Sequence, residues 1–142
     1  MTSQHRVNGS RVTFLDEAVH DLVELHSTRP LAARAVVSVL LKLEKGDVRP
    51  QRLRSFSKTG DLSDCGKLTV LVDDEPELRV VVRDVGDDGF EVVEVVAIAE
   101  RADDLAYLVT ALRLERITDP VRKSDTTRRL ARILAARRAT QD

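Results

Sequence analysis

The chain has 142 residues, of which 42% are hydrophobic, 33% are charged and only 3% are aromatic, and its formal net charge is −1. These values are typical of one globular domain with an aliphatic core. Cys65 is the single cysteine, which excludes a disulfide scaffold and a cysteine-based zinc site within the chain. No apolar stretch is long enough for a signal peptide or a membrane span, so a cytoplasmic protein is expected.

The first half of the chain predicts one strand and two helices. Residues 1–10 are expected to form a disordered leader, and residues 11–15 a strand. A helix is predicted from Asp16, an N-cap residue type, with an apolar stripe at helical spacing formed by Leu15, Ala18, Val19, Leu22 and Val23. A second helix is predicted from Pro30, which suits a first turn, to Gly46, which ends it. The short connection makes the two helices antiparallel.

The second half predicts a small sheet, a helix and a tail. Residues 47–66 are polar and irregular, and strands are expected at 67–72, 78–85 and 90–99. Their short connectors are rich in turn-forming residues, which predicts an antiparallel three-stranded meander. A third helix is expected from Asp103, with an apolar stripe of Leu105, Leu108, Val109 and Leu112.

The tail is basic, while the remainder of the chain is acidic. Residues 119–142 hold seven Arg or Lys and three Asp, a net charge of +4, so the rest of the chain carries −5. An RNA or DNA contact would therefore need a local patch or the tail. A fourth helix is expected over residues 124–138, with its apolar side on the domain or on a second copy and its arginines outward. A basic arm for RNA is the alternative, as is a frayed, exposed helix.

These elements predict an α+β fold in the order β-α-α-β-β-β-α. A curled antiparallel sheet would pack on the helical pair, the strand at 11–15 would join the meander, and a C-terminal helical tail would follow. The predicted organisation is a leader at 1–10, a domain at 11–117 and a basic helical tail at 118–142.

This order, together with four local stretches, resembles the RelE/ParE toxin superfamily of bacterial toxin–antitoxin systems. The resemblance covers about residues 11–116. The matching stretches are Arg52-Leu53-Arg54, Asp61-Leu62-Ser63-Asp64-Cys65-Gly66-Lys67, Leu78-Arg79-Val80-Val81, and Val95-Val96-Ala97-Ile98-Ala99-Glu100-Arg101, followed by Tyr107 six residues later.

The resemblance implies a function and a set of site residues. Members of the RelE branch are metal-free ribonucleases that cut messenger RNA, often on the ribosome, whereas the ParE branch inhibits DNA gyrase by binding. The RelE pattern implies a catalytic lysine at Lys67, phosphate and leaving-group arginines at Arg79 and Arg101, and a substrate-ordering aromatic at Tyr107. It also implies an RNA-binding arginine at Arg54.

Two positions depart from that pattern. Thr69 stands where the ribonucleases commonly carry a second lysine, and Gly66 stands where an aromatic or basic residue is frequent. A threonine on the face that Lys67 shares can donate a hydrogen bond to a phosphate oxygen but cannot neutralise its charge. We therefore expect Thr69 to contact RNA and cleavage to be weak rather than absent.

The residues themselves are compatible with metal-free RNA cleavage. That chemistry needs a base for the ribose 2′-OH, a cation for the phosphorane and an acid for the leaving oxygen. His20 and His26 fall on different faces of one helix and are interpreted as surface residues. Lys67 remains as the base candidate, and a lysine base needs a lowered pKa, which neighbouring arginines would favour. The alternative is that Lys67, Arg79 and Arg101 are ordinary exposed cations.

Tyr107, the only tyrosine, lies on the far side of the third helix from its apolar stripe. It is either a partly exposed tyrosine or a platform for a nucleobase. Cys65 lacks a paired histidine and is interpreted as a small packing residue. The acidic turn at 73–77 lacks calcium-loop spacing, and neither a metal nor another cofactor is predicted.

The leading hypothesis is thus a toxin acting as a messenger-RNA endoribonuclease, with a cognate antitoxin protein, messenger RNA and the ribosome as partners and no membrane contact. The first alternative is a ParE-like gyrase inhibitor. The second is an inactive superfamily member that acts as an interaction or regulatory module. A homodimer through the tail is a further hypothesis.

Overall fold

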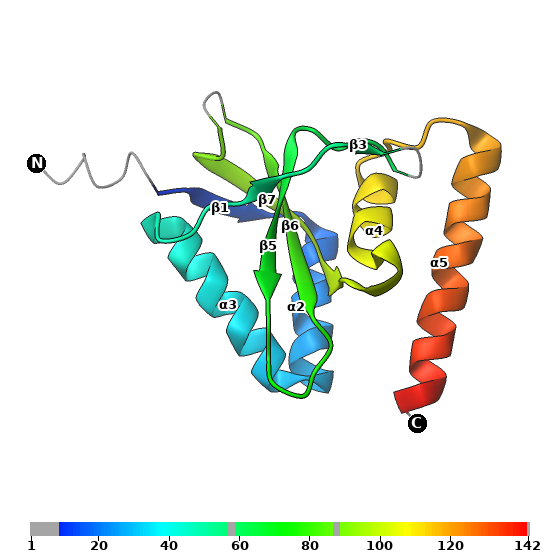
Figure 1. Ribbon diagram of the computed structural model, residues 1–142, viewed down its shortest axis with the longest axis horizontal. Coiled ribbons are helices and arrows are strands. Elements are labelled where there is room, and N and C mark those ends of the chain that lie inside the picture. Colours follow the sequence, from blue (N-terminus) through cyan, green and yellow to red (C-terminus); the bar gives the residue numbers. More distant parts are fainter. Residues whose placement is uncertain (1–8, 57–58, 87–88, 142) are drawn as a thin grey trace, which may run out of the picture.

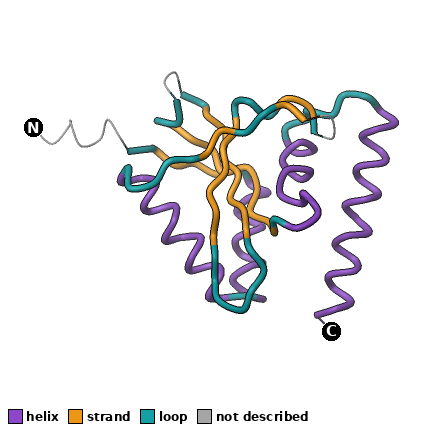
Figure 2. Tube along the Cα trace, in the orientation of Figure 1, coloured by secondary structure: helices purple, strands orange, loops and turns teal. Residues whose placement is uncertain are grey.

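The computed structural model describes residues 9–56, 59–86 and 89–141, and it has the α+β architecture expected from the sequence. A five-stranded sheet lies between α2 and α3 on one side and α4 on the other, with α5 beside α4 (Figures 1 and 2). Most of the expected leader, residues 1–8, lies outside the described residues.

The two N-terminal helices form where the sequence predicts them. Helix α2 spans Asp16–Thr28, and α3 spans Pro30–Lys45 with proline in its first turn. Gly46 ends α3 in a left-handed conformation (φ 82°), which glycine adopts without steric cost. The predicted N-cap was wrong by one residue, because Leu15 is the cap of α2 and Asp16 is already helical.

The buried side of α2 differs from the predicted stripe. Ala18 is buried, while Leu15, Leu22 and Leu25 pack partly against the core. Val19 and Val23 are exposed, at 46% and 63%. Helix α3 buries one side more completely, because Ala32, Val36, Leu40 and Leu43 are all buried.

The sheet has the order β1-β7-β6-β5-β2. Strands β5 (Cys65–Val70), β6 (Leu78–Asp84) and β7 (Val92–Glu100) form the predicted antiparallel meander. Strand β1 (Arg11–Phe14) joins it as expected, but it pairs with β7 in parallel, so the sheet is mixed rather than wholly antiparallel. A bulge interrupts the β6–β7 register between Val81 and Val82.

Residues 47–66 are more ordered than predicted. They contain β2 (Gln51–Arg52), which pairs with β5 and adds a fifth strand, and the small pair β3 (Ser55–Phe56) and β4 (Gly60–Asp61). The predicted strand at 67–72 was shifted, because pairing with β6 begins at Cys65 and ends at Val70. Leu71 lies beyond the pairing and is 71% exposed.

Alternation along the strands divides the core into two clusters. The larger cluster joins α2 and α3 to one sheet face through residues such as Val36, Leu68, Val80 and Val95. The smaller cluster covers the other face under α4 and the segment before β5. Its buried members are Leu53, Leu62, Cys65, Val81, Ala97 and Ala106.

The third helix begins later than predicted. Residues Ala102–Asp104 form a 3-10 turn, η1, and α4 spans Leu105–Arg113. Its buried residues are Leu105, Ala106, Leu108, Thr110 and Ala111, so the predicted positions Val109 and Leu112 lie at the margin of the buried face.

The tail helix, α5, is longer than predicted and spans Pro120–Gln141. It contacts α4, and Leu130 and Ile133 are half-buried on that side. Arg137 was predicted to point outward. Instead it forms ion pairs with Glu100 and with Asp103, whose Oδ2 lies 3.2 Å from one guanidinium nitrogen. The side chain of Arg138 lies outside the described residues.

Truncation after Asp119 is expected to lower the melting temperature by about 4–8 °C. The docked contacts of Leu130, Ile133 and Arg137 would be lost, at a cost of about 1–2 kcal/mol for half-exposed groups. Differential scanning calorimetry measures this change, and size-exclusion chromatography of both forms tests for a dimer through the tail. An unchanged melting temperature would contradict the docking of α5, and an unchanged oligomer size would contradict the dimer.

Within the described residues, the helices are too short or too polar to traverse a lipid bilayer.

Candidate functional site

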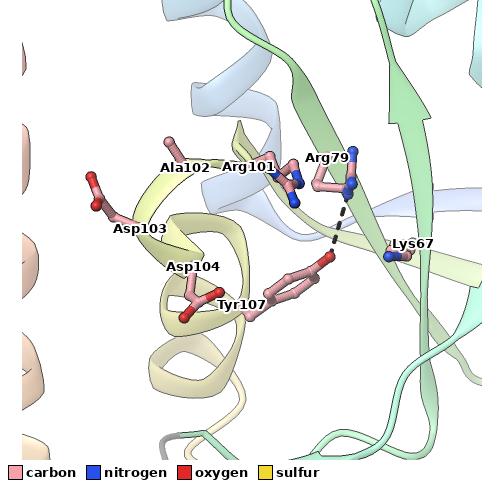
Figure 3. A pocket seen from close by; sticks show the side chains of 7 residues that line it. All are labelled: Lys67, Arg79, Arg101, Ala102, Asp103, Asp104 and Tyr107. Atoms are coloured by element: carbon pink, nitrogen blue, oxygen red, sulfur yellow. Dashed lines mark hydrogen bonds between the residues drawn. The ribbon is translucent and has the colours of Figure 1, made fainter.

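A hollow of about 370 Å³ lies where the start of β6 and the end of β7 meet the start of α4. Seven residues line it (Figure 3): Lys67, Arg79, Arg101, Ala102, Asp103, Asp104 and Tyr107. Among them are all four residues predicted to be catalytic, which come from four different elements. We call this hollow the cationic groove.

The strands place Lys67 and Arg79 on one sheet face. Lys67 pairs with Val81 across β5 and β6, and Thr69 pairs with Arg79. Directly paired residues in antiparallel strands share a face, so Lys67, Thr69 and Arg79 all belong to the face that α4 covers at one end. Arg101 follows the last residue of β7 and is held by its backbone, because its N–H donates to Glu77 C=O at 2.9 Å.

The turn after Arg101 has an unusual backbone. Asp103 and Asp104 both have positive φ, at 61° and 57°. Aspartate tolerates this left-handed region better than most residues do, but two in succession store strain, and such strain is concentrated at functional sites. The turn reverses the chain so that α4 brings Tyr107 back over the sheet.

Arg79 is the buried centre of the groove, since only 7% of the residue is exposed. Its Nε donates a hydrogen bond to the Tyr107 hydroxyl at 3.3 Å, shown as a dashed line in Figure 3. A second guanidinium nitrogen donates to Glu77 Oε2. Tyr107 packs its ring against the smaller core cluster. The ring thus packs on the sheet side of α4 rather than on its far side, contrary to the prediction, and its hydroxyl orients Arg79.

Glu77 is the residue that sequence reasoning missed. Its Oε2 accepts from Arg79 and also lies 3.7 Å from Arg101 Nε. The signal was present, because residues 77 and 79 share a face by strand alternation. The acidic turn at 73–77 was considered only as a strand connector and as a calcium loop, and neither interpretation gives a role to its last residue.

The groove offers cations to an anionic ligand. The Arg101 side chain is 63% exposed, and Lys67 is partly exposed beside it. Guanidinium groups bind phosphate through paired N–H donors, and an ammonium binds it as a point charge. Such a set could hold a phosphodiester and stabilise charge that develops on it.

The two residues predicted to bind RNA are not among those that line the groove. Thr69 is exposed on the same sheet face, opposite Arg79. Arg54 is exposed between β2 and β3. His20 and His26 are exposed on α2, as predicted. In the described part of the chain there is no group of His, Cys, Asp and Glu that could hold a metal ion.

The segment before β5 is fixed by one ion pair. Arg116 donates two hydrogen bonds to the Asp64 carboxylate, both at 2.8 Å, and one to Asp61 C=O. The Arg116 guanidinium lowers the pKa of Asp64. This contact ties the chain after α4 to the residue that precedes β5, the strand that carries Lys67.

Gly66 has a packing explanation. A Cβ at this position would lie 2.6 Å from Pro50 Cβ and 2.8 Å from Phe90 Cζ. The space is thus filled by the Phe90 ring, on which Arg52 also stacks at 4.7 Å from the ring centre. The aromatic or basic side chain of the family pattern has no room here.

Cys65 is fully buried in the smaller cluster, as its interpretation as a packing residue requires. Burial raises the pKa of its thiol to about 12. The native protein is therefore expected to resist alkylation by iodoacetamide at about pH 8, where the thiol stays protonated, and to react fully in denaturant. Mass spectrometry measures the labelled fraction, and rapid labelling of the native chain would contradict the prediction.

Comparisons with known proteins give a likeness of structure but not of sequence family. No family model matches the chain, and no curated protein matches it. Among solved structures, the chain is similar to a mutant of the E. coli toxin RelE in the free state, with 22% sequence identity and a TM-score of 0.49. The likeness covers 77% of this chain and 98% of the RelE chain.

Proposed function

We propose that the chain is the toxin of a type II toxin–antitoxin system and that it cleaves messenger RNA without a metal ion. The observation that carries the proposal is the convergence of Lys67, Arg79, Arg101 and Tyr107 on one groove. These residues belong to sequence motifs that lie up to 40 positions apart in the chain.

Each residue has a role in the proposed reaction. Lys67 takes the proton of the ribose 2′-OH, and the 2′ oxygen attacks the phosphorus. Arg79 and Arg101 hold the charge of the phosphorane and of the 5′ oxygen as its bond to phosphorus breaks, and the 5′ oxygen takes a proton from water to leave as a hydroxyl. Tyr107 orients Arg79 through its hydroxyl, and its ring would serve as a platform on which a base stacks.

Residues outside the groove extend the proposed contact with RNA. Arg54 would bind a phosphate, and Thr69 would donate a hydrogen bond to one. Messenger RNA on the ribosome is the proposed substrate, and a cognate antitoxin protein would restrain the activity by covering the groove. The candidate antitoxin is the protein encoded by a small reading frame next to the gene, and this is the protein to co-express.

Induced expression with two separate readouts tests the function. We expect RNA integrity to fall, while plasmid supercoiling stays as in uninduced cells. Co-expression of the neighbouring protein should restore growth. A loss of supercoiling with intact RNA would instead indicate the gyrase inhibitor. If the protein is harmless when expressed alone and binds no neighbour-encoded protein, the toxin proposal fails.

The Thr69→Lys variant is expected to cleave RNA about 3- to 10-fold faster at pH 7. The new ammonium would share the sheet face with Lys67 and Arg79 and add positive charge toward the phosphorane. Initial rates on a fluorescent RNA oligonucleotide measure the effect. Thr118→Lys is the matched control, because it adds the same charge at an exposed position outside the groove. Equal acceleration in both variants would indicate general attraction of RNA rather than catalysis.

A further inference from the structure

The backbone holds Glu77 between the two arginines of the groove. Leu78 pairs with Glu100 at the start of β6, so the preceding residue, Glu77, lies opposite Arg101. The hydrogen bond from Arg101 N–H to Glu77 C=O fixes this position. Glu77 is also two residues before Arg79, on the same side of the chain. The carboxylate therefore starts from a backbone site that adjoins both guanidinium groups.

One oxygen of Glu77 serves both arginines. Oε2 accepts a hydrogen bond from Arg79 and lies within ion-pair distance of Arg101 Nε, at 3.7 Å. An anionic oxygen shared by two guanidinium groups is the arrangement that a non-bridging phosphate oxygen adopts with an arginine pair. Glu77 thus provides within the chain the type of oxygen that a phosphodiester would bring.

The exposure of these side chains distinguishes this contact from a purely structural ion pair. Arg79 is buried and requires a partner, because an unpaired buried charge is costly. Arg101 is 63% exposed and has no such requirement, yet it faces the same carboxylate. The Glu77 side chain is 33% exposed, so it is free to swing toward water when another anion replaces it.

We propose that Glu77 is an internal competitor for the substrate phosphate, which must displace its carboxylate from Arg79 and Arg101 before the groove can bind RNA. This inference rests on the proposed function for the identity of the ligand. In the free chain, Glu77 keeps Arg79 paired and lowers the affinity of the groove for anions. Its negative charge makes the groove less positive than its lysine and two arginines alone would make it.

Phosphate binding by the Glu77→Gln variant tests the proposal. Glutamine keeps an oxygen that accepts from Arg79, but it removes the competing charge. Inorganic phosphate is titrated into the full-length chain, and binding is followed by NMR of the arginine Nε–Hε groups. We expect about 10-fold tighter binding than in the unaltered chain, from the loss of one nearby negative charge. The melting temperature should also rise more steeply with phosphate.

Glu75→Gln is the matched control. Glu75 lies two residues earlier on the same turn and pairs with Arg29 at 2.8 Å, away from the groove. The Glu75→Gln variant has the same change in net charge as Glu77→Gln, and we expect its phosphate affinity to stay within about twofold of that of the unaltered chain. Equal gains in both variants would indicate a general charge effect and overturn the proposal.

A second variant covers the case in which Glu77→Gln does not fold. Glu77→Asp keeps the charge but shortens the side chain by one methylene, which withdraws it from Arg101. We expect about threefold tighter phosphate binding. Unchanged phosphate affinity in the folded variants overturns the proposal, whether or not RNA is cleaved. Tighter phosphate binding without any RNA cleavage supports the competitor role and counts against the ribonuclease alone.

Discussion

Replacing Arg101 by alanine is expected to lower the rate of RNA cleavage by about 100-fold or more. Arg101 presents the most exposed guanidinium of the groove to a bound phosphate. Removing one such group that stabilises developing charge typically costs two to three orders of magnitude in rate. Lys67→Ala is expected to cost less, because water can accept the 2′-OH proton in its place. Single-turnover cleavage of an RNA oligonucleotide measures both rates.

The control for this comparison is Arg128→Ala. Arg128 is an exposed arginine on α5 outside the groove, and its loss should leave the rate within about twofold of that of the unaltered chain. If Lys67→Ala, Arg101→Ala and Thr69→Lys all cleave at the rate of the unaltered chain, the groove is not an active site. The gyrase inhibitor or the inactive interaction module would then replace the ribonuclease.

The Asp21→Ala variant is expected to lower the free energy of unfolding by about 3 kcal/mol. Asp21 on α2 accepts two hydrogen bonds from Arg113 at the end of α4, at 2.6 and 2.8 Å, and one from Ile98 N–H at 3.0 Å. Arg113 also donates to Val96 C=O. The substitution would leave a largely buried guanidinium and a backbone N–H without their carboxylate. Urea denaturation followed by circular dichroism measures the change.

Asp125→Ala provides the contrast for this stability measurement. Asp125 and Arg128 form an ion pair one turn apart on α5, with side chains 62% and 71% exposed. Exposed pairs contribute little, so the expected loss is below about 0.5 kcal/mol. If Asp21→Ala costs no more than Asp125→Ala, then Asp21 does not link α2 to α4 through the sheet.

Local chemistry made several elements predictable. Pro30 and Gly46 bound α3 because one suits a first helical turn and the other adopts a left-handed end at no cost. The meander could be predicted from its short connectors, because short connectors can join only antiparallel neighbouring strands. The orientation of β1 relative to its neighbour could not be predicted, because an isolated strand carries no local signal of orientation. Its parallel pairing with β7 depends on where the helical pair packs.

Of the residues in and around the groove, only those that belong to a sequence motif could be predicted. Lys67, Arg79, Arg101 and Tyr107 were selected in this way, and the structure brings them together. Their partners were not selected, because ion pairs such as Asp21 with Arg113 join positions far apart in the chain. Arg137 was expected to point outward, because its ion-pair partners are also far away in the sequence. Only the docking of α5 brings it to Glu100 and Asp103.

The packing of Phe90 against Gly66 links the evolutionary histories of these two positions. Any side chain at 66 would collide with the ring at 90 and with Pro50, so a substitution at position 66 alone is blocked. The order of mutational steps is therefore constrained: both Pro50 and Phe90 must first change or shift, and only then can position 66 gain a side chain. Natural variants of this chain should accordingly keep glycine at 66 wherever both the proline at 50 and the ring at 90 are retained.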